Sequence, residues 1–256
     1  MTRHLVTLLV PFLAACATTP PAGSPAQAAA LRYRESFHAS AGTAFVATLG
    51  RDELVAALDK ARVLWLGDHH ASSRLHAMQS ELLEQLRRRG VRMAFVLEAV
   101  GTQDGPQVQQ YLAGELSIED LRKVMRKRWS GSWLDDTELD PFFYRSLLAF
   151  AKKHQIPVTP LEPTPRGTLA DRDEAMAKVV QEAIAAHPDR LVVVVVGQAH
   201  LLGEGDLVHR TNQPWLAIGG EPPVGLRSAP GERSRYSLLQ SDSGLFWFSE
   251  LCRDPR

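Results

Sequence analysis

Short apolar runs alternate with longer amphipathic stretches along most of the chain, a pattern that predicts strands alternating with helices. The run at 191–196 contains five consecutive valines and has no polar face, so it predicts a central strand buried on both sides. The pattern as a whole predicts an α/β fold with an open, mainly parallel β-sheet and helices on both faces. The strands are expected at residues 44–49, 63–66, 91–97, 157–161, 191–196 and 215–218.

The segments between these runs have helical spacing. In residues 74–89, an apolar stripe recurs every three or four residues, and Gly90 ends the predicted helix. Further helices are expected near 51–61, 169–186 and 206–210. Residues 104–154 break the alternation with two or three helices that carry many aromatic side chains. We predict that this insertion forms a helical lid over the carboxyl edge of the sheet.

The last part of the chain predicts a C-terminal β-hairpin. Residues 236–240 and 245–250 flank the turn sequence Ser241-Asp242-Ser243-Gly244. We see neither an internal repeat nor a second domain, so residues 31–256 are expected to form a single α/β domain.

The first 30 residues resemble the leader and linker of a bacterial lipoprotein. A basic start at Arg3 and His4 precedes an apolar run that is too short to span a bilayer, and the run ends in Leu13-Ala14-Ala15-Cys16. This predicts a signal peptide over 1–15 and lipidation, with palmitate among the acyl chains, at Cys16. The alternative is an ordinary signal peptide in which the cysteine is accidental. Ala17 favours the outer membrane, and residues 16–30 predict a flexible, lipid-anchored tether.

The charge balance and the number of cysteines limit which binding partners and which disulfides this chain is expected to have. The chain has 29 basic and 29 acidic side chains, and its basic clusters at 87–89 and 122–128 are typical of solvated helix faces. We therefore expect no nucleic-acid partner. Of the two cysteines, Cys16 is assigned to the lipid, so Cys252 has no disulfide partner within the chain.

Four predicted strands each deliver an acid or an imidazole where the strand ends. Because ligands bind outside the carboxyl ends of parallel strands, we expect these side chains to share one crevice. Two of the exits have the form Gly-x-x-His, in which the glycine permits a tight turn. Such a set suits metal ligation or proton transfer, and the alternative is that the residues only pair with one another or cap helices. The exits are Gly67-Asp68-His69-His70, Glu98, Glu162 and Gly197-Gln198-Ala199-His200.

With these motifs, the aromatic helical middle and the lipobox Leu13-Ala14-Ala15-Cys16, roughly residues 44–220 resemble the ChaN-type haem-binding lipoproteins. That family shares a superfamily with the Tiki proteins and the erythromycin esterases. The first family motif is usually Gly-Glu-x-His, and Asp68 stands here where the glutamate is usual. The resemblance implies haem binding linked to iron uptake at the outer membrane, facing the periplasm. It also implies an uptake receptor as partner and a dimer mediated by haem.

The first functional hypothesis is a haem-binding module, and the resemblance is its main support. An iron ligand is sought among Tyr144, Tyr111 and the histidines, and cations for the propionates at Arg166 or in the basic cluster 122–128. The candidate haem-binding residues are Gly67, Asp68, His69, His70, Tyr144, Arg166, Gly197 and His200.

The second hypothesis is a hydrolase like the Tiki and esterase relatives. In them the Gly-x-x-His histidines and a glutamate are the working residues. Here His70 or His200 would be the general base, or His70, Glu98 and His200 would bind a divalent metal that activates water. A third option is a structural lipoprotein whose crevice no longer functions.

Overall fold

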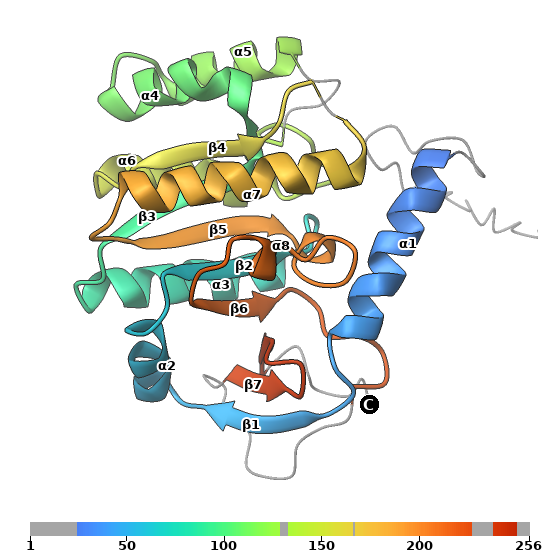
Figure 1. The fold of residues 1–256 in the computed structure, drawn as a ribbon. Helices are drawn as coiled ribbons and strands as arrows, with labels where there is room; N and C mark the ends of the chain where they lie inside the picture. The colour runs from blue at the N-terminus through green and yellow to red at the C-terminus, as the bar shows by residue number, and fades with distance from the viewer. Residues whose placement is uncertain (1–24, 129–132, 166, 227–237, 250–256) are drawn as a thin grey trace, which may run out of the picture.

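The computed structural model describes residues 25–128, 133–165, 167–226 and 238–249 (Figure 1). Its centre is one eight-stranded sheet in which the two pairings nearest one edge are antiparallel and every other pairing is parallel. The predicted α/β class and mainly parallel sheet are therefore confirmed. In sheet order, the strands are β1 (Phe45–Leu49), β7 (Leu238–Ser241), β8 (Phe246–Phe248), β6 (Trp215–Gly219), β2 (Val63–Asp68), β5 (Leu191–Gly197), β3 (Met93–Gly101) and β4 (Val158–Glu162).

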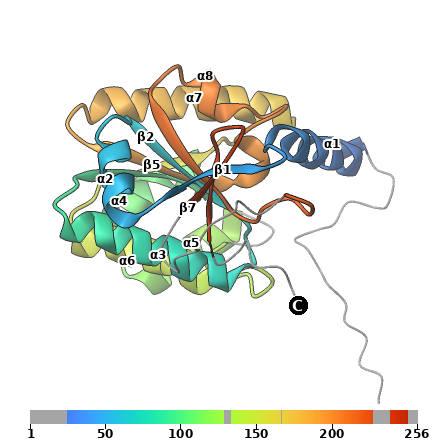
Figure 2. The same ribbon diagram turned by 90° about the horizontal axis from the view of Figure 1, so that it is seen from below.

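Helices cover both faces of this sheet, as Figure 2 shows. Alternate residues of β2 point to opposite sides: Leu64 and Leu66 belong to one apolar core, whereas Val63 and Trp65 belong to the other. The first core lies under α2 (Arg51–Leu58), α3 (Ser73–Arg88), α4 (Gly105–Ala113), α5 (Ile118–Arg128) and α6 (Pro141–Lys153), and the second under α1 (Pro25–Ser40), α7 (Leu169–Ala186) and α8 (Leu207–Arg210).

The valine-rich strand β5 lies between β2 and β3, and its residues Leu191–Gly197 are all buried. The prediction of a central strand is confirmed. The hairpin prediction is confirmed as well, because β7 and β8 pair antiparallel across a turn in which Gly244 has a φ of +86°.

The N-terminal helix corrects the predicted tether. Residues 25–30, which the sequence predicts to be part of a flexible linker, form the first turns of α1. Proline is favourable at the start of a helix and alanine within it, and the buried side chains of Tyr33 and Phe37 attach the helix to the domain. Cys16 and residues 17–24 lie outside the described residues. None of the described helices combines the length and the apolar character needed to cross a bilayer.

The helical insertion, predicted as a lid, contributes helices to one layer of the fold. After the short 3-10 turn η1 (Thr102–Asp104), helices α4 to α6 lie on one face of the sheet and contribute to its core. What reaches the carboxyl edge is the connection before α6, where Trp133 contacts the His70 ring and the Asp140 amide donates to the His70 carbonyl. The aromatic side chains of the insertion are therefore mostly core, with Trp133 and Tyr144 at the crevice.

Candidate functional site

The carboxyl ends of β2, β5 and β3 lie side by side, so their polar exits meet. Asp68 is in register with Gly197 across the β2–β5 pair, and Leu97 is in register with Val195 across the β3–β5 pair. Glu98 follows Leu97 inside β3, which runs on to Gly101, instead of lying after the strand as predicted. The register of β3 against β4 shifts between Leu97 and Gly101, at the level of the site.

Asp68 is the acceptor at the centre of the β2 exit. Its side chain is buried, and its two oxygens accept hydrogen bonds from His76 Nε2 at 2.7 Å and from the Tyr144 hydroxyl at 2.7 Å. His70 Nδ1 lies 3.1 Å from the second oxygen. Burial opposes ionisation of Asp68, but the hydrogen bonds and charges of His70 and His76 outweigh it and hold the pKa of Asp68 well below its ordinary value.

His70 is the more accessible member of this pair, with 34% of its side chain exposed. Burial of the ring tends to lower its pKa, whereas the hydrogen bond to Asp68 and the negative charges of Asp68 and Glu98 raise the pKa above the ordinary imidazole value. Because Nδ1 faces Asp68, the ring is held in one orientation, with Trp133 edge-on at a centroid distance of 4.4 Å.

His76, on helix α3, contacts the Asp68 carboxylate directly. Its Nε2 faces Asp68, and its Nδ1 faces Asp140 Oδ2 at 3.0 Å. The ring also stacks on Phe143 at 3.9 Å. His76 therefore fixes the position of the Asp68 carboxylate.

Glu98 joins the β2 exit to the β5 exit. Its Oε2 accepts the backbone N–H of Gly197 at 2.7 Å. A Cβ atom at Gly197 would lie only 3.3 Å from the His70 ring and 3.4 Å from Glu98 Oε2, so a side chain at this position would crowd both groups. Burial alone would raise the pKa of Glu98, but the charges of His200, His70 and Arg172 and the Gly197 N–H keep it below the ordinary value.

Arg172, from the first turns of α7, supplies the buried cation. Its Nη2 donates to Glu98 Oε1 at 2.9 Å and to Glu162 Oε2 at 2.6 Å. Burial works against the charged guanidinium, but Glu98 and Glu162 raise the pKa of Arg172. Glu162, at the end of β4, is therefore an ion-pair partner of Arg172 within the same site.

His200 approaches Glu98 from the other side. It ends the short turn η2 (Gln198–His200) after β5, and its Nε2 lies 3.8 Å from Glu98 Oε1. Its Nδ1 faces Asp173 Oδ1 at 2.5 Å, and Asp173 is fully buried on α7. Glu98 thus lies between the imidazoles of His70 and His200.

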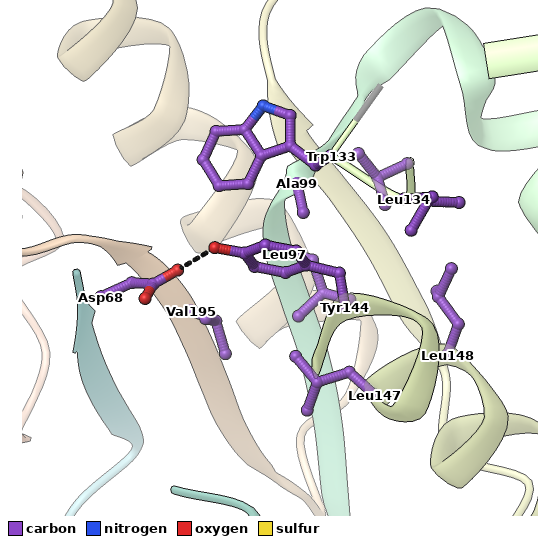
Figure 3. Close-up of a pocket in the computed structure, with 10 residues that line it drawn as sticks. Asp68, Leu97, Ala99, Trp133, Leu134, Tyr144, Leu147, Leu148 and Val195 are labelled. Carbon is purple, nitrogen blue, oxygen red and sulfur yellow. Dashed lines mark hydrogen bonds between the residues drawn. The ribbon is translucent and has the colours of Figure 1, made fainter. Parts of the chain in front are cut away.

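Next to the polar cluster lies a closed apolar pocket, drawn in Figure 3. The Tyr144 ring from α6 crosses it and directs its hydroxyl at Asp68. The space between the lining side chains does not admit a water-sized sphere. Burial and the charge of Asp68 raise the pKa of Tyr144 far above its ordinary value, so the phenol stays protonated in this arrangement. The lining residues include Trp133, Leu134, Leu97, Ala99, Leu147 and Leu148.

The structure brings His70, Glu98 and His200 together as the sequence predicts, with Gly67 and Asp68 in the last residues of β2 and Gly197 at the end of β5. His69, in contrast, points away from the cluster: 51% of its side chain is exposed, and Nε2 lies 3.9 Å from Glu221 Oε2. Tyr111 lies elsewhere, under Lys152, and Arg166 is outside the described residues. In the part of the chain that the structure describes, no group of three or more His, Cys, Asp or Glu side chains is arranged to hold a metal ion.

Sequence reasoning missed four residues of the site, and all come from helices or from a helix N-cap. Arg172 and Asp173 lie on the buried face of α7 together with Met176 and Ala177. Polar residues at positions where the helical pattern calls for apolar ones could have indicated that they belong to the site. The other two are His76, which lies next to Leu75 on the buried face of α3, and Asp140, which caps α6.

This chain is similar to several solved structures and to a family model. Among curated proteins, none matches the chain. Several solved structures resemble the chain at low sequence identity. The type III effector HopBA1 has 16% identity and a TM-score of 0.49, over 77% of this chain and 91% of that one. The toxin effector domain RRSP from Vibrio vulnificus has 17% identity and a TM-score of 0.48, over 92% of this chain and 44% of that one.

The third similar structure is ChaN of Campylobacter jejuni, described as binding haem cofacially. It has 10% identity and a TM-score of 0.46, over 73% of this chain and 88% of that one. A family model described as haem-binding uptake, Tiki superfamily, ChaN matches residues 54–166. That segment contains Asp68, His70, Glu98 and Tyr144, so the part of the chain that resembles the ChaN-type family supplies these residues of the site.

Proposed function

We propose that this chain binds haem at the mouth of the strand-exit crevice, as a lipid-anchored protein of the cell envelope that serves haem or iron uptake. The observation that carries the proposal is the family match over residues 54–166, which includes most of the residues at the crevice. Anchoring at Cys16, a location at the outer membrane facing the periplasm, an uptake receptor and a haem-mediated dimer are parts of the same proposal.

The accessible donors favour the crevice mouth over the inner pocket as the haem site. A porphyrin does not fit the inner pocket as it stands, because that space excludes even a water-sized sphere. Tyr144 is 2% exposed, and its hydroxyl is already bonded to Asp68. The imidazoles of His69 and His70 are exposed at the strand exit, and Trp133 offers an aromatic surface beside His70. Imidazole is a common axial ligand of haem iron. Haem would bring the iron when it binds, and the exposed imidazoles could then serve as its ligand.

The haem proposal predicts that the double variant His69→Ala/His70→Ala weakens haemin binding by on the order of tenfold or more, because an iron ligand is lost. Tyr144→Phe should leave the Soret band in place. The measurement is a haemin titration followed by absorbance.

The matched control is His209→Ala, which removes an exposed imidazole that contacts Trp215 at the amino end of β6, away from the crevice. It should bind haemin as the unaltered chain does. A shifted Soret band in Tyr144→Phe, with unchanged binding by the double histidine variant, would place the iron ligand in the inner pocket instead.

A second candidate function, hydrolysis, is favoured by the orientation of His70. Asp68 fixes its Nδ1, Glu98 lies beside the same ring, and part of the ring is exposed. A histidine held in this way is suited to take a proton from water as the water oxygen attacks a carbonyl carbon. The proton transfer proposed here uses only side chains of this chain.

The hydrolase candidate predicts that His70→Gln lowers hydrolysis of p-nitrophenyl acetate by about 10²-fold, the usual contribution of a general base. The pH profile gives a second check. A base works only when it is neutral, so the rate should rise with pH through the raised pKa of His70 and reach half its maximum above the ordinary imidazole value. With His209→Gln as the control, equal rates in all three proteins, or no hydrolysis in any, would remove this candidate.

The anchoring part of the proposal predicts that Cys16→Ser abolishes incorporation of labelled palmitate and moves the protein from the membrane fraction to the soluble fraction. Cys252→Ser is the control and should behave as the unaltered chain, because it lies outside the lipobox. Retention of Cys16→Ser in the membrane fraction would argue for another means of attachment.

A further inference from the structure

The N-terminal helix α1 packs directly against the turn that carries His200. Tyr33 and Phe37 are buried on its inner side. Ser36 Oγ accepts the backbone N–H of Glu204 at 2.8 Å, just beyond the turn η2. The Tyr33 ring meets the His200 ring edge-on, with centroids 6.1 Å apart. Helix α1 is thus part of the wall of the site, although it lies outside the segment 54–166 that matches the family model.

The two carboxylate oxygens of Asp173 differ in their hydrogen bonding. Its Oδ1 faces His200 Nδ1. Its Oδ2 is buried and, within the described residues, has no hydrogen-bond partner. A buried polar oxygen without a donor is costly, so a nearby donor is expected. The Tyr33 hydroxyl is such a donor: burial and the Asp173 carboxylate raise its pKa, which keeps the phenol protonated.

The same order of groups occurs on the other side of Glu98. There the hydroxyl of Tyr144 donates to Asp68, and Asp68 faces Nδ1 of His70. In each case a tyrosine from a helix approaches a buried aspartate that orients an imidazole at a strand exit. The two units come from different parts of the chain, so the likeness lies in the arrangement of side chains.

We propose that Tyr33 is a positioning residue for His200, and that its hydroxyl donates to the free oxygen of Asp173 and so holds the Asp173–His200 pair in place. Glu98 from β3 and Tyr33 from α1 face the His200 ring of this pair, and the charge of Arg172 on α7 interacts with Asp173. The proposal rests on the proposed function in treating His200 as part of the working site. Helix α1 then completes one half of the crevice.

The test reads the His200 ring directly and needs neither haem nor a substrate. Nitrogen-15 NMR of the purified full-length chain, labelled at histidine, reports the ring-nitrogen shifts of His200, and His200→Gln assigns the signals. Tyr33→Phe keeps the ring that packs on His200 and removes only the hydroxyl. It should change the Nδ1 shift of His200, because the acceptor of that nitrogen loses its second donor.

Phe37→Leu is the matched control on the same helix. Phe37 is fully buried and contacts His38 and Trp247, so this change should lower the urea midpoint and leave the His200 shifts unaltered. An unchanged Nδ1 shift in Tyr33→Phe overturns the proposal. An equal change in Phe37→Leu overturns it too, because the effect would then belong to docking of the helix and not to the hydroxyl. A chain that binds no haem and hydrolyses no ester would defeat the proposed function and leave this result standing.

Discussion

The structure of the crevice depends on one buried guanidinium. Arg172 lies between Glu98 and Glu162, two carboxylates that are 4% and 0% exposed. Charges removed from water in this way are stable only when they are paired, and breaking a buried pair usually costs several kcal/mol. Because Arg172 comes from α7 while the acids come from β3 and β4, the pairing also fixes the helix against the carboxyl edge of the sheet.

The position of the other polar groups follows from that pairing. Arg172 occupies one oxygen of Glu98, the Gly197 N–H occupies the other, and the two imidazoles approach from either side. Aspartates hold both histidines, so neither ring is free to turn. Such a preorganised cluster with one accessible imidazole is compatible with binding a large planar ligand at its mouth and with moving a proton. For this reason the same geometry supports both functional candidates.

The sequence predicts much of this site because strand exits are local features. Apolar runs that end in glycine, acid and histidine identify Asp68, His70, Glu98, Glu162 and His200, and parallel topology brings them together. The site residues that come from helices are not predicted, because the helical pattern does not distinguish Arg172 and Asp173 from the other positions of α7. Tyr144 was recognised, but not that Asp68 would bury and bind its hydroxyl. Residues 25–30, the first turns of α1, are predicted as part of the tether because this proline- and alanine-rich segment gives no sign that it continues into a helix whose Tyr33 and Phe37 are buried against the domain.

A double-mutant cycle on Arg172 and Glu98 tests the central claim most directly: that one shared ion pair holds the crevice together. Arg172→Met alone should lower the free energy of unfolding by about 3–5 kcal/mol, because it removes the cation that two buried carboxylates share. Glu98→Gln keeps the shape and an acceptor for Gly197. Urea unfolding of both single variants and the double variant then gives the coupling energy. The account predicts that the double variant is more stable than the sum of the single effects implies, by on the order of 1–3 kcal/mol. Additive effects would contradict it, because the two residues would then be independent parts of the fold.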